Sequence, residues 1–308
     1  MAANVRLPAP TGQGTISDVP IFRRENVYGP GLFRGYHALA ADGIRAYVVR
    51  SSGLRHDSKL LRPLYPAALP TRRLHLSVPI SGELWLRRGE QSLVIDSNHA
   101  WLEEPSFEYE RWMGAPHVSL HLEWSLDLVG ATAEQGRILL GAETQFRCAR
   151  LATAILDPGV RHQERHRRIL AVVESLADAG LPLDPNPFAH ALAPLGPNMT
   201  RTCDALGEVL SALSDQPMES DLEARLQVSN RQLRRRLPGL LRMFGGANET
   251  FRDMVHRVRL CDAVGLIAGT SLSVVEVAKL VGYGSPHALR RALRRRQLAA
   301  PSVLRRTT

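Results

Sequence analysis

Two short stretches near the carboxyl end repeat one spacing of basic and apolar residues. Residues 229–237 and 285–293 both follow the pattern S-x-x-x-L-R-R-x-L. On a helix, residues three and four positions apart share a face, so the leucines lie on one side and the basic residues on another. Arginine can donate two hydrogen bonds to O6 and N7 of guanine, and an α-helix fits the DNA major groove. The spacing therefore predicts two recognition helices that read base pairs.

The candidate contact residues divide by the role expected of them. More than half of protein–DNA hydrogen bonds go to phosphate and sugar, so not every arginine reads a base. The expected base contacts are Arg231, Arg234, His287 and Arg290. Arg235, Arg291 and Arg294 could equally bind phosphate or form ion pairs within the protein. The complete predicted DNA-binding set is Asn230, Arg231, Arg234, Arg235, Pro286, His287, Arg290, Arg291 and Arg294.

A shorter helix precedes each recognition helix, which outlines two helix-turn-helix units, at about 219–237 and 273–296. Ser220 and Ser273 each begin an S-x-x-E sequence, which is typical of a capping box at a helix start. Pro286 suits the first position of its helix, where a missing N–H costs nothing. Pro238 should end the first recognition helix early, because proline inside a helix removes a hydrogen bond.

Residues 251–267 connect the two units with an amphipathic helical period. Such a helix would hold the units at a fixed separation. Recognition helices that point the same way about 34 Å apart enter successive major grooves on one face of DNA. One chain could then read two half-sites.

The positive charge of the chain is concentrated in this region. The net charge is +9 overall, but residues 218–308 hold 17 Lys+Arg and 7 Asp+Glu, whereas the rest holds 22 and 23. This asymmetry favours a segment that neutralises phosphates and releases counterions. The alternative is a solvated basic face without a partner.

Length and composition indicate two folded domains. At 308 residues and 34.0 kDa the chain exceeds one ordinary core, and 44% hydrophobic residues argue against disorder. Cys148, Cys203 and Cys261 lie far apart, so neither a disulfide framework nor a cysteine metal site is expected. The chain shows no signal peptide and no apolar run of about 18 residues, so we expect a cytoplasmic protein without a membrane partner.

The amino-terminal half has a β-rich pattern followed by helical periodicity. Strands are expected at 44–50, 74–79, 82–86, 92–95 and 117–124, and helices between about 132 and 179 and from 199 to 213. We therefore predict an α+β chain. The predicted order is a flexible arm at 1–27, a β-rich domain with flanking helices at 28–180, a proline-rich connector at 181–198 and a DNA-binding domain at 199–308.

The sequence evidence for small-ligand sites in this half is weaker than the evidence for DNA contacts near the carboxyl end. Four histidines, His75, His99, His117 and His121, lie in the β region, but no H-x-H sequence completes a ligand set, so we expect no metal and no cofactor. Trp85 and Trp101 are candidates for an effector cavity, and plain core packing is the alternative for both.

The carboxyl-terminal residues resemble the AraC/XylS family of transcriptional regulators over about 219–305. The resemblance is carried by R-L-x-x-A-x-x-L at 259–266, E-V-A-x-x-x-G-Y at 276–283, L-x-R-A-L at 289–293 and P-S-x-x-R at 301–305. It implies an all-α domain with two helix-turn-helix units, joined to an amino-terminal domain used for effector sensing or dimerisation. Residues 74–85 and 94–105 resemble a cupin-like β jelly roll more loosely.

The sequence thus predicts a transcription factor that binds promoter DNA and catalyses no reaction. Its expected partners are double-stranded promoter DNA, a small-molecule effector, RNA polymerase and a second copy of the chain. The alternative is a metal-dependent cupin enzyme with a basic carboxyl-terminal appendage.

Overall fold

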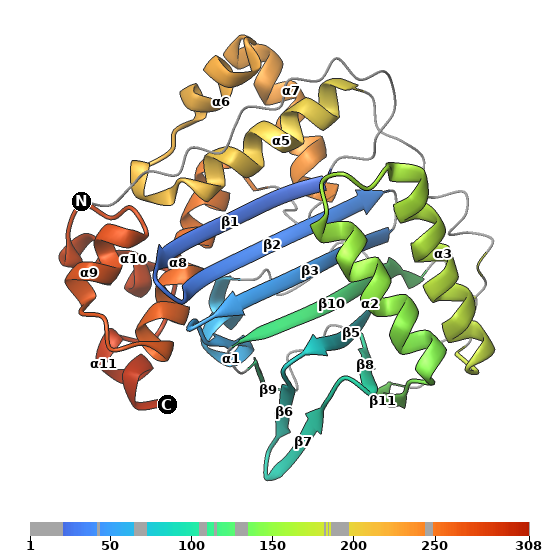
Figure 1. Ribbon diagram of the computed structural model, residues 1–308. Helices are drawn as coiled ribbons and strands as arrows, with labels where there is room; N and C mark the ends of the chain where they lie inside the picture. Colours follow the sequence, from blue (N-terminus) through green and yellow to red (C-terminus); the bar gives the residue numbers. More distant parts are fainter. Residues whose placement is uncertain are drawn as a thin grey trace.

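The computed structural model describes residues 21–41, 44–64, 73–104, 110–113, 116–126, 135–181, 183, 185, 197–243 and 249–307. A β-rich domain is followed by a helical domain, which confirms the predicted α+β class (Figure 1). None of the helices in these ranges is long and apolar enough to cross a membrane.

The strands form two antiparallel sheets. One has seven strands in the order β1-β2-β3-β10-β5-β8-β11, and the other has four in the order β4-β9-β6-β7. The strands are β1 Ile21–Gly29, β2 Leu32–Ala41, β3 Ile44–Ser52, β4 His56–Asp57, β5 Arg73–Ser81, β6 Leu84–Arg88, β7 Gln91–Ile95, β8 His99–Glu103, β9 Glu110–Met113, β10 His117–Ser125 and β11 Gly136–Leu139. This pair of sheets is the predicted cupin-like arrangement.

The helices flank the larger sheet and make up the carboxyl-terminal half. They are α1 Ser58–Leu61, α2 Ala142–Leu156, α3 His162–Asp178, α5 Pro197–Ser211, α6 Glu219–Leu226, α7 Asn230–Met243, α8 Phe251–Gly269, α9 Val274–Leu280, α10 Pro286–Arg295 and α11 Pro301–Leu304. Short 3-10 turns occupy Arg62–Leu64, Leu213–Asp215 and Arg305–Thr307.

Two boundaries differ from the sequence-based expectation. Residues 21–27, assigned above to an arm, belong to β1, where alternate residues are buried and the backbone pairs with β2. Ile138 and Leu139, expected in a helix, lie in β11, because pairing with β8 outweighs their helical spacing. Residues 1–20 and most of the expected connector at 181–198 lie outside the described residues.

The two faces of the seven-stranded sheet pack against different partners. One face contributes apolar residues of β3, β5 and β10, such as Val48, Leu76 and Leu120, to a core completed by α2 and α3. In Figure 1 these two helices lie in front of the sheet. Side chains alternate between faces along a strand, so the neighbours of these residues point the other way. That second face meets the four-stranded sheet at one end and the carboxyl-terminal helices at the other.

Helix α8 is shared by two hydrophobic cores. Its first half, with Phe251 and Val255, packs with α5, α6 and α7, and its second half, with Leu260 and Ile267, packs with α9 and α10. The prediction that this helix connects the two units is confirmed. The amphipathic pattern predicted one exposed face on this helix, and that prediction was wrong. Residues 258–268 are all buried, because the β domain covers the face that does not pack against the other helices.

A buried carboxylate on α8 joins the two domains. Asp262 has no exposed surface and accepts hydrogen bonds from Arg24 at 2.9 Å, Arg34 at 3.1 Å and the Tyr28 hydroxyl at 2.5 Å. The three donors come from β1 and β2, more than 200 residues away in sequence. A buried charge is tolerated only where it is paired and hydrogen-bonded. We call this group the Asp262 clamp.

Close backbone packing reinforces the same interface. Gly207 of α5 lies so near β1 that an added Cβ would sit 2.2 Å from the carbonyl oxygen of Arg23. Asn26 of β1 donates from its amide nitrogen to the carbonyl oxygens of Leu210 and Ser211, at 3.0 and 2.9 Å. Any larger residue at position 207 would push α5 away from the sheet.

The three cysteines are buried in three different cores. Cys148 lies in the core under α2 and α3, Cys203 in the core between β1 and α5, and Cys261 on α8 beside the Asp262 clamp. Burial raises the pKa of Cys148 to about 12, and burial also raises the thiol pKa of the other two. All three are free thiols.

We expect Asp262→Asn to destabilise the protein by about 3–5 kcal/mol, because it leaves two buried arginines without their counter-charge. Urea unfolding at neutral pH measures the change. Asp215→Asn, at an exposed position, is the matched control and should change the free energy of unfolding by less than about 0.5 kcal/mol. Equal effects of the two substitutions would show that the clamp contributes nothing to stability.

Candidate nucleic-acid interface and effector site

The first helix of the amino-terminal unit begins differently from the sequence-based expectation. The backbone N–H of Met218 donates to the carboxylate of Asp221 at 2.7 Å, and Ser220 lies inside the first turn of α6. The predicted capping box at Ser220 is therefore wrong, because the helix begins two residues earlier and Asp221, instead of Glu223, supplies the capping carboxylate. Glu223 is left free to make another contact.

The corresponding helix of the second unit begins as predicted. The Ser273 hydroxyl accepts from the backbone N–H of Glu276 at 3.2 Å, and the Glu276 carboxylate accepts from the N–H of Ser273 at 2.7 Å. Hydrogen bonding to Ser273 lowers the pKa of Glu276. The carboxylate of Glu276 therefore interacts with the first residues of its own helix.

Tight turns position both recognition helices. Gln227 ends α6 with a φ of 54°, and Ser285 caps α10 by accepting from the N–H of Ala288 at 3.1 Å, with Pro286 at the first helical position. Gly282 ends α9 with a φ of 79°, and an added Cβ there would lie 2.0 Å from the carbonyl oxygen of Leu213. Only glycine meets both requirements.

The leucines and the basic residues of the repeat separate as predicted. Leu233 and Leu237 of α7 and Leu289 and Leu293 of α10 are at most 4% exposed. The predicted contact residues on the other faces are exposed, apart from half-buried Pro286: Asn230, Arg231, Arg234, Arg235, His287, Arg290, Arg291 and Arg294. Their roles on DNA, and the separation of about 34 Å, stay predictions.

Proline 238 does not end the first recognition helix, contrary to expectation. Helix α7 continues through it to Met243. The continuation buries Leu240 and Leu241 completely in the core shared with α5 and α8. Burying two leucines stabilises by about 3–6 kcal/mol, which offsets the roughly 3 kcal/mol that an internal proline costs. Packing therefore overrides the local preference.

The basic side chains differ in what surrounds them. Arg231, Arg235, Arg290, Arg291 and Arg294 form no ion pair within the described part of the chain. A groove of about 830 Å³ lies between α10 and α11. Its basic lining residues are His287, Arg290, Arg291, Arg294 and Arg305. On α7, by contrast, Arg234 lies 3.8 Å from Glu219. The positive surface is therefore less compensated at α10.

Residues 222–307 match the family model described as a helix-turn-helix domain. This stretch begins within α6 and contains the rest of the first unit, the whole second unit, α8 and the closing helix α11. Residues 222–307 are a helix-turn-helix domain of the AraC type. The family match over these residues favours DNA binding and transcription regulation over the metal-dependent enzyme considered above.

Other comparisons are more distant. No curated protein matches the sequence. The chain is similar to solved structures of ToxT from Vibrio cholerae (11% identity over 85% of this chain and 97% of that one, TM-score 0.33) and of the AraC-like transcriptional activator CuxR (14%, 73% and 79%, TM-score 0.34). It is also similar to wild-type ToxT with an unsaturated fatty acid bound (12%, 84% and 94%, TM-score 0.31).

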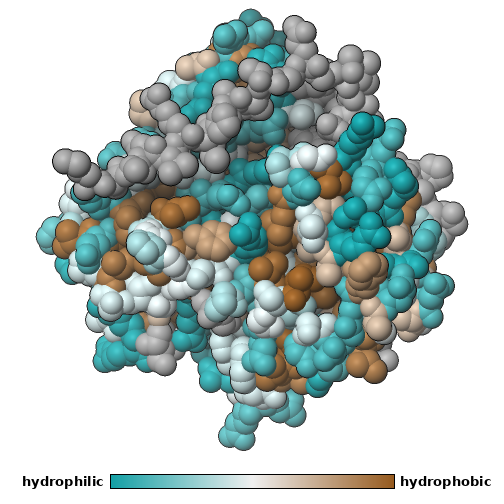
Figure 2. Space-filling view, in the orientation of Figure 1, coloured by the Kyte–Doolittle hydropathy of each residue, from teal (hydrophilic) through white to brown (hydrophobic). Residues whose placement is uncertain are grey.

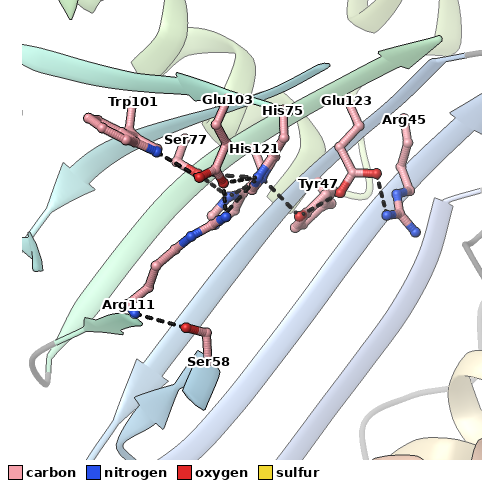
Figure 3. A network of polar contacts seen from close by, with 10 residues as sticks. All are labelled: Arg45, Tyr47, Ser58, His75, Ser77, Trp101, Glu103, Arg111, His121 and Glu123. Carbon is pink, nitrogen blue, oxygen red and sulfur yellow. Dashed lines mark hydrogen bonds and ion pairs between the residues drawn. The ribbon is translucent and has the colours of Figure 1, made fainter. Parts of the chain in front are cut away.

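A second concentration of functional groups lies between the two sheets, beside a small apolar core that includes Leu86 and Met113. We call it the inter-sheet cluster. It consists of Tyr47, His75, Ser77, Trp101, Glu103, Arg111, Ser119, His121 and Glu123. Figure 3 shows most of these side chains converging from β3, β5, β8, β9 and β10.

The cluster is held together by short contacts. His75 Nε2 lies 3.1 Å from His121 Nδ1, and the Tyr47 hydroxyl donates to Glu123 at 3.0 Å. Arg111 is the residue of the smaller sheet that reaches across, pairing with Glu103 and lying 3.3 Å from His75. Burial, then the charges of nearby arginines, lowers the pKa of His75 well below its ordinary value. Burial also lowers the pKa of His121 well below its ordinary value, so burial favours the neutral form of both rings.

The two tryptophan candidates lie on opposite sides of the smaller sheet. Trp101 is buried and donates from Nε1 to Glu103 at 2.9 Å, within the cluster. Trp85 stacks on Trp112 at 6.0 Å on the outer face, at the base of the β6–β7 hairpin. Figure 2 shows that the tip of this hairpin is hydrophilic. Trp101 is thus retained as an effector-site candidate, and Trp85 is not.

Sequence inspection missed most of the cluster. Tyr47, Arg111 and Glu123 were not selected, because they lie on three different strands and only cross-strand register brings them together. The alternation H-x-S-x-H-x-E at 117–123 was the available signal, since it places all four residues on one buried face. Within the described residues, no three His, Cys, Asp or Glu side chains are arranged to hold a metal ion. His99 lies apart, 2.6 Å from Asp96.

The buried ring of His117 makes the stability of the protein depend on pH. Its ring is buried, neither nitrogen has a hydrogen-bond partner, and burial lowers its pKa to about 4. The unfolded chain therefore binds this proton more tightly than the folded one. The stabilising effect of the neutral ring is complete above about pH 6.5 and is lost as pH falls toward 4, a change of roughly 3 kcal/mol.

We expect His117→Leu to make the free energy of unfolding fall less steeply between these pH values than in the wild type. Urea unfolding at several pH values measures this slope. His287→Ala, at an exposed histidine, should leave it unchanged. If His117→Leu has the same slope as the wild type, the buried His117 ring does not cause this pH dependence.

Proposed function

We propose that α7 and α10 enter successive major grooves of promoter DNA and that the β domain controls this binding. The observation that supports it most directly is the pairing of buried leucines with solvent-facing arginines on both helices, each packed on the same helix α8. A shared rigid support is what two half-sites read by one chain require.

The expected roles of individual residues follow from position and chemistry. Arg231, Arg234, His287 and Arg290 read base edges, whereas Arg235, Arg291 and Arg294 bind phosphates. Asn230 and Pro286 begin the two recognition helices, where the first turn approaches the backbone of DNA. The residues at 199–308 form the DNA-binding domain in this proposal, and those at 28–180, extended to 21, form the control domain.

The inter-sheet cluster supports control by a small-molecule effector. Buried ionisable groups lower stability compared with apolar packing, so their presence between two sheets favours a ligand-binding role. Each carboxylate of the cluster already has an arginine partner, because Arg111 pairs with Glu103, and Glu123 pairs with Arg45 and lies 3.9 Å from Arg73. We infer an uncharged polar effector that exchanges hydrogen bonds with the histidines, serines and Tyr47.

A series of ring contacts leads from this cluster to the DNA-binding domain. Tyr47 stacks on His121 at 4.7 Å and contacts Tyr36 at 5.3 Å, and Tyr36 contacts Phe22 at 6.0 Å. Phe22 belongs to the same core as α5, α7 and the first half of α8. A ligand that moves Tyr47 in one of two domain arrangements would change their relative populations.

Dimerisation through the β domain is the second candidate for control. Leu139 of the edge strand β11 is 71% exposed, and Phe146, which follows seven residues later on α2, is 57% exposed. Apolar side chains at a sheet edge suit contact with a second copy. The homodimer and the contact with RNA polymerase stay predictions.

We expect Arg290→Ala to weaken binding by about 1–3 kcal/mol only for duplexes that carry the preferred base at one position. Duplexes selected from a random pool by the wild type, and single-base variants of them, provide the probes for fluorescence anisotropy. Arg167→Ala, on α3, removes one charge far from the recognition helices and is the control. Uniform weakening across all duplexes would assign Arg290 to phosphate instead.

We expect an effector found by thermal-shift screening of neutral polar metabolites to stabilise the wild type and to lose most of this effect in Trp101→Phe. That substitution keeps an aromatic ring but removes the N–H that contacts Glu103. Trp85→Phe, on the outer face, should respond like the wild type. A ligand whose shift is equally large in both variants would lie outside the cluster.

A further inference from the structure

The two helix-turn-helix units use the same glutamate of their repeat differently. Glu223 and Glu276 occupy the same place in the S-x-x-E pattern that begins each unit. Glu276 accepts hydrogen bonds at the start of its own helix, from Ser273. Glu223 is released from that role because Asp221 caps α6. The difference leaves a carboxylate of unit one free to face its recognition helix.

In the first unit, helix α6 places two carboxylates against α7. Glu223 accepts from the side-chain amide of Asn230, the first residue of α7, at 2.6 Å. Glu219 lies 3.8 Å from the guanidinium of Arg234, one turn further along the same face. Both of the contacted residues belong to the predicted DNA-binding set. The contacts are exposed, so each one is weak by itself.

In the second unit, no carboxylate of α9 contacts the predicted DNA-binding residues of α10 among the contacts of the described residues. Pro286 stands where Asn230 stands in the first unit and has no side-chain donor. Arg290, Arg291 and Arg294 form no ion pair within the residues that the structure describes. The only charged residue in the last turn of α9 is Lys279, which adds positive charge.

We propose that Glu219 and Glu223 mask the first recognition helix, so that unit two supplies most of the sequence-independent affinity and unit one supplies discrimination. Phosphates repel carboxylates, and an arginine already paired with glutamate releases fewer counterions on binding DNA. Unit one can then enter a groove only where base contacts offset the loss of Asn230–Glu223 and Arg234–Glu219. A repulsive element of this kind raises specificity by disfavouring wrong sites. The inference rests on the proposed function.

The double variant Glu219→Gln/Glu223→Gln tests the mask, with a random-sequence 40-base-pair duplex as the probe. We expect several-fold tighter binding at low salt, and a plot of log affinity against log salt that is steeper by about 0.9 for each arginine released. Glu143→Gln/Glu164→Gln is the control, because it also removes two helix glutamates that have side-chain partners, here arginines on α2 and α3. It makes the same change in net charge.

A second measurement separates discrimination from general affinity. The ratio of affinities for a selected duplex and the random duplex should fall in Glu219→Gln/Glu223→Gln and stay constant in the control. Circular dichroism and unfolding midpoints show whether α6 still forms in each variant. On the random duplex, Arg291→Ala should weaken wild-type binding more than Arg234→Ala does, because Arg291 is proposed to bind phosphate whereas Arg234 is already paired with Glu219.

The outcomes distinguish this inference from the function on which it rests. If the wild type binds no duplex at any salt concentration, the proposed function fails and the mask fails with it. If the wild type binds but both glutamine pairs change affinity, salt slope and specificity ratio equally, the mask alone is wrong. Tighter binding with a lower specificity ratio, in the α6 variant only, supports it.

Discussion

The arrangement of the whole molecule depends on one buried carboxylate. Asp262 lies near the middle of α8, and three donors from β1 and β2 satisfy it. Because α8 also forms the wall of both helix-turn-helix cores, the clamp fixes the support of the two recognition helices relative to the β domain. Buried ionic groups are weak sources of stability but strong determinants of a single arrangement. The desolvation cost of these buried charges is consistent with an interface that favours one arrangement of the two domains over maximal stability.

Two routes therefore connect the control domain with the DNA-binding domain. The clamp acts on the second half of α8, whereas the ring contacts from Tyr47 through Tyr36 to Phe22 act on the core around its first half. A third connection leads from the inter-sheet cluster to the second unit. The backbone N–H of Arg111 donates to Ser58 of α1 at 2.8 Å, and Leu61 of α1 lies in the core formed by the second half of α8.

Local signals predicted the recognition region well. The repeated leucine and arginine spacing placed α7 and α10 correctly, because helical periodicity and solvent exposure are properties of short segments. Ser220 and Pro238 were misjudged, since a competing carboxylate and the burial of Leu240 and Leu241 outweighed the local rule. The Asp262 clamp could not be predicted, because its partners are more than 200 residues apart and nothing in either segment marks them as neighbours. Most of the inter-sheet cluster was missed because cross-strand register, which spacing within one strand does not reveal, brings its residues together.

The buried thiols give the protein built-in probes of domain separation. Cys203 and Cys261 lie at the interface between β1 or β2 and the helices, whereas Cys148 lies inside the β domain alone. Raised pKa values and burial keep all three unreactive in the closed arrangement. Alkylation by a small reagent therefore proceeds only through opening, and its rate at the two interface sites, compared with Cys148, reports how often the domains part without any introduced label.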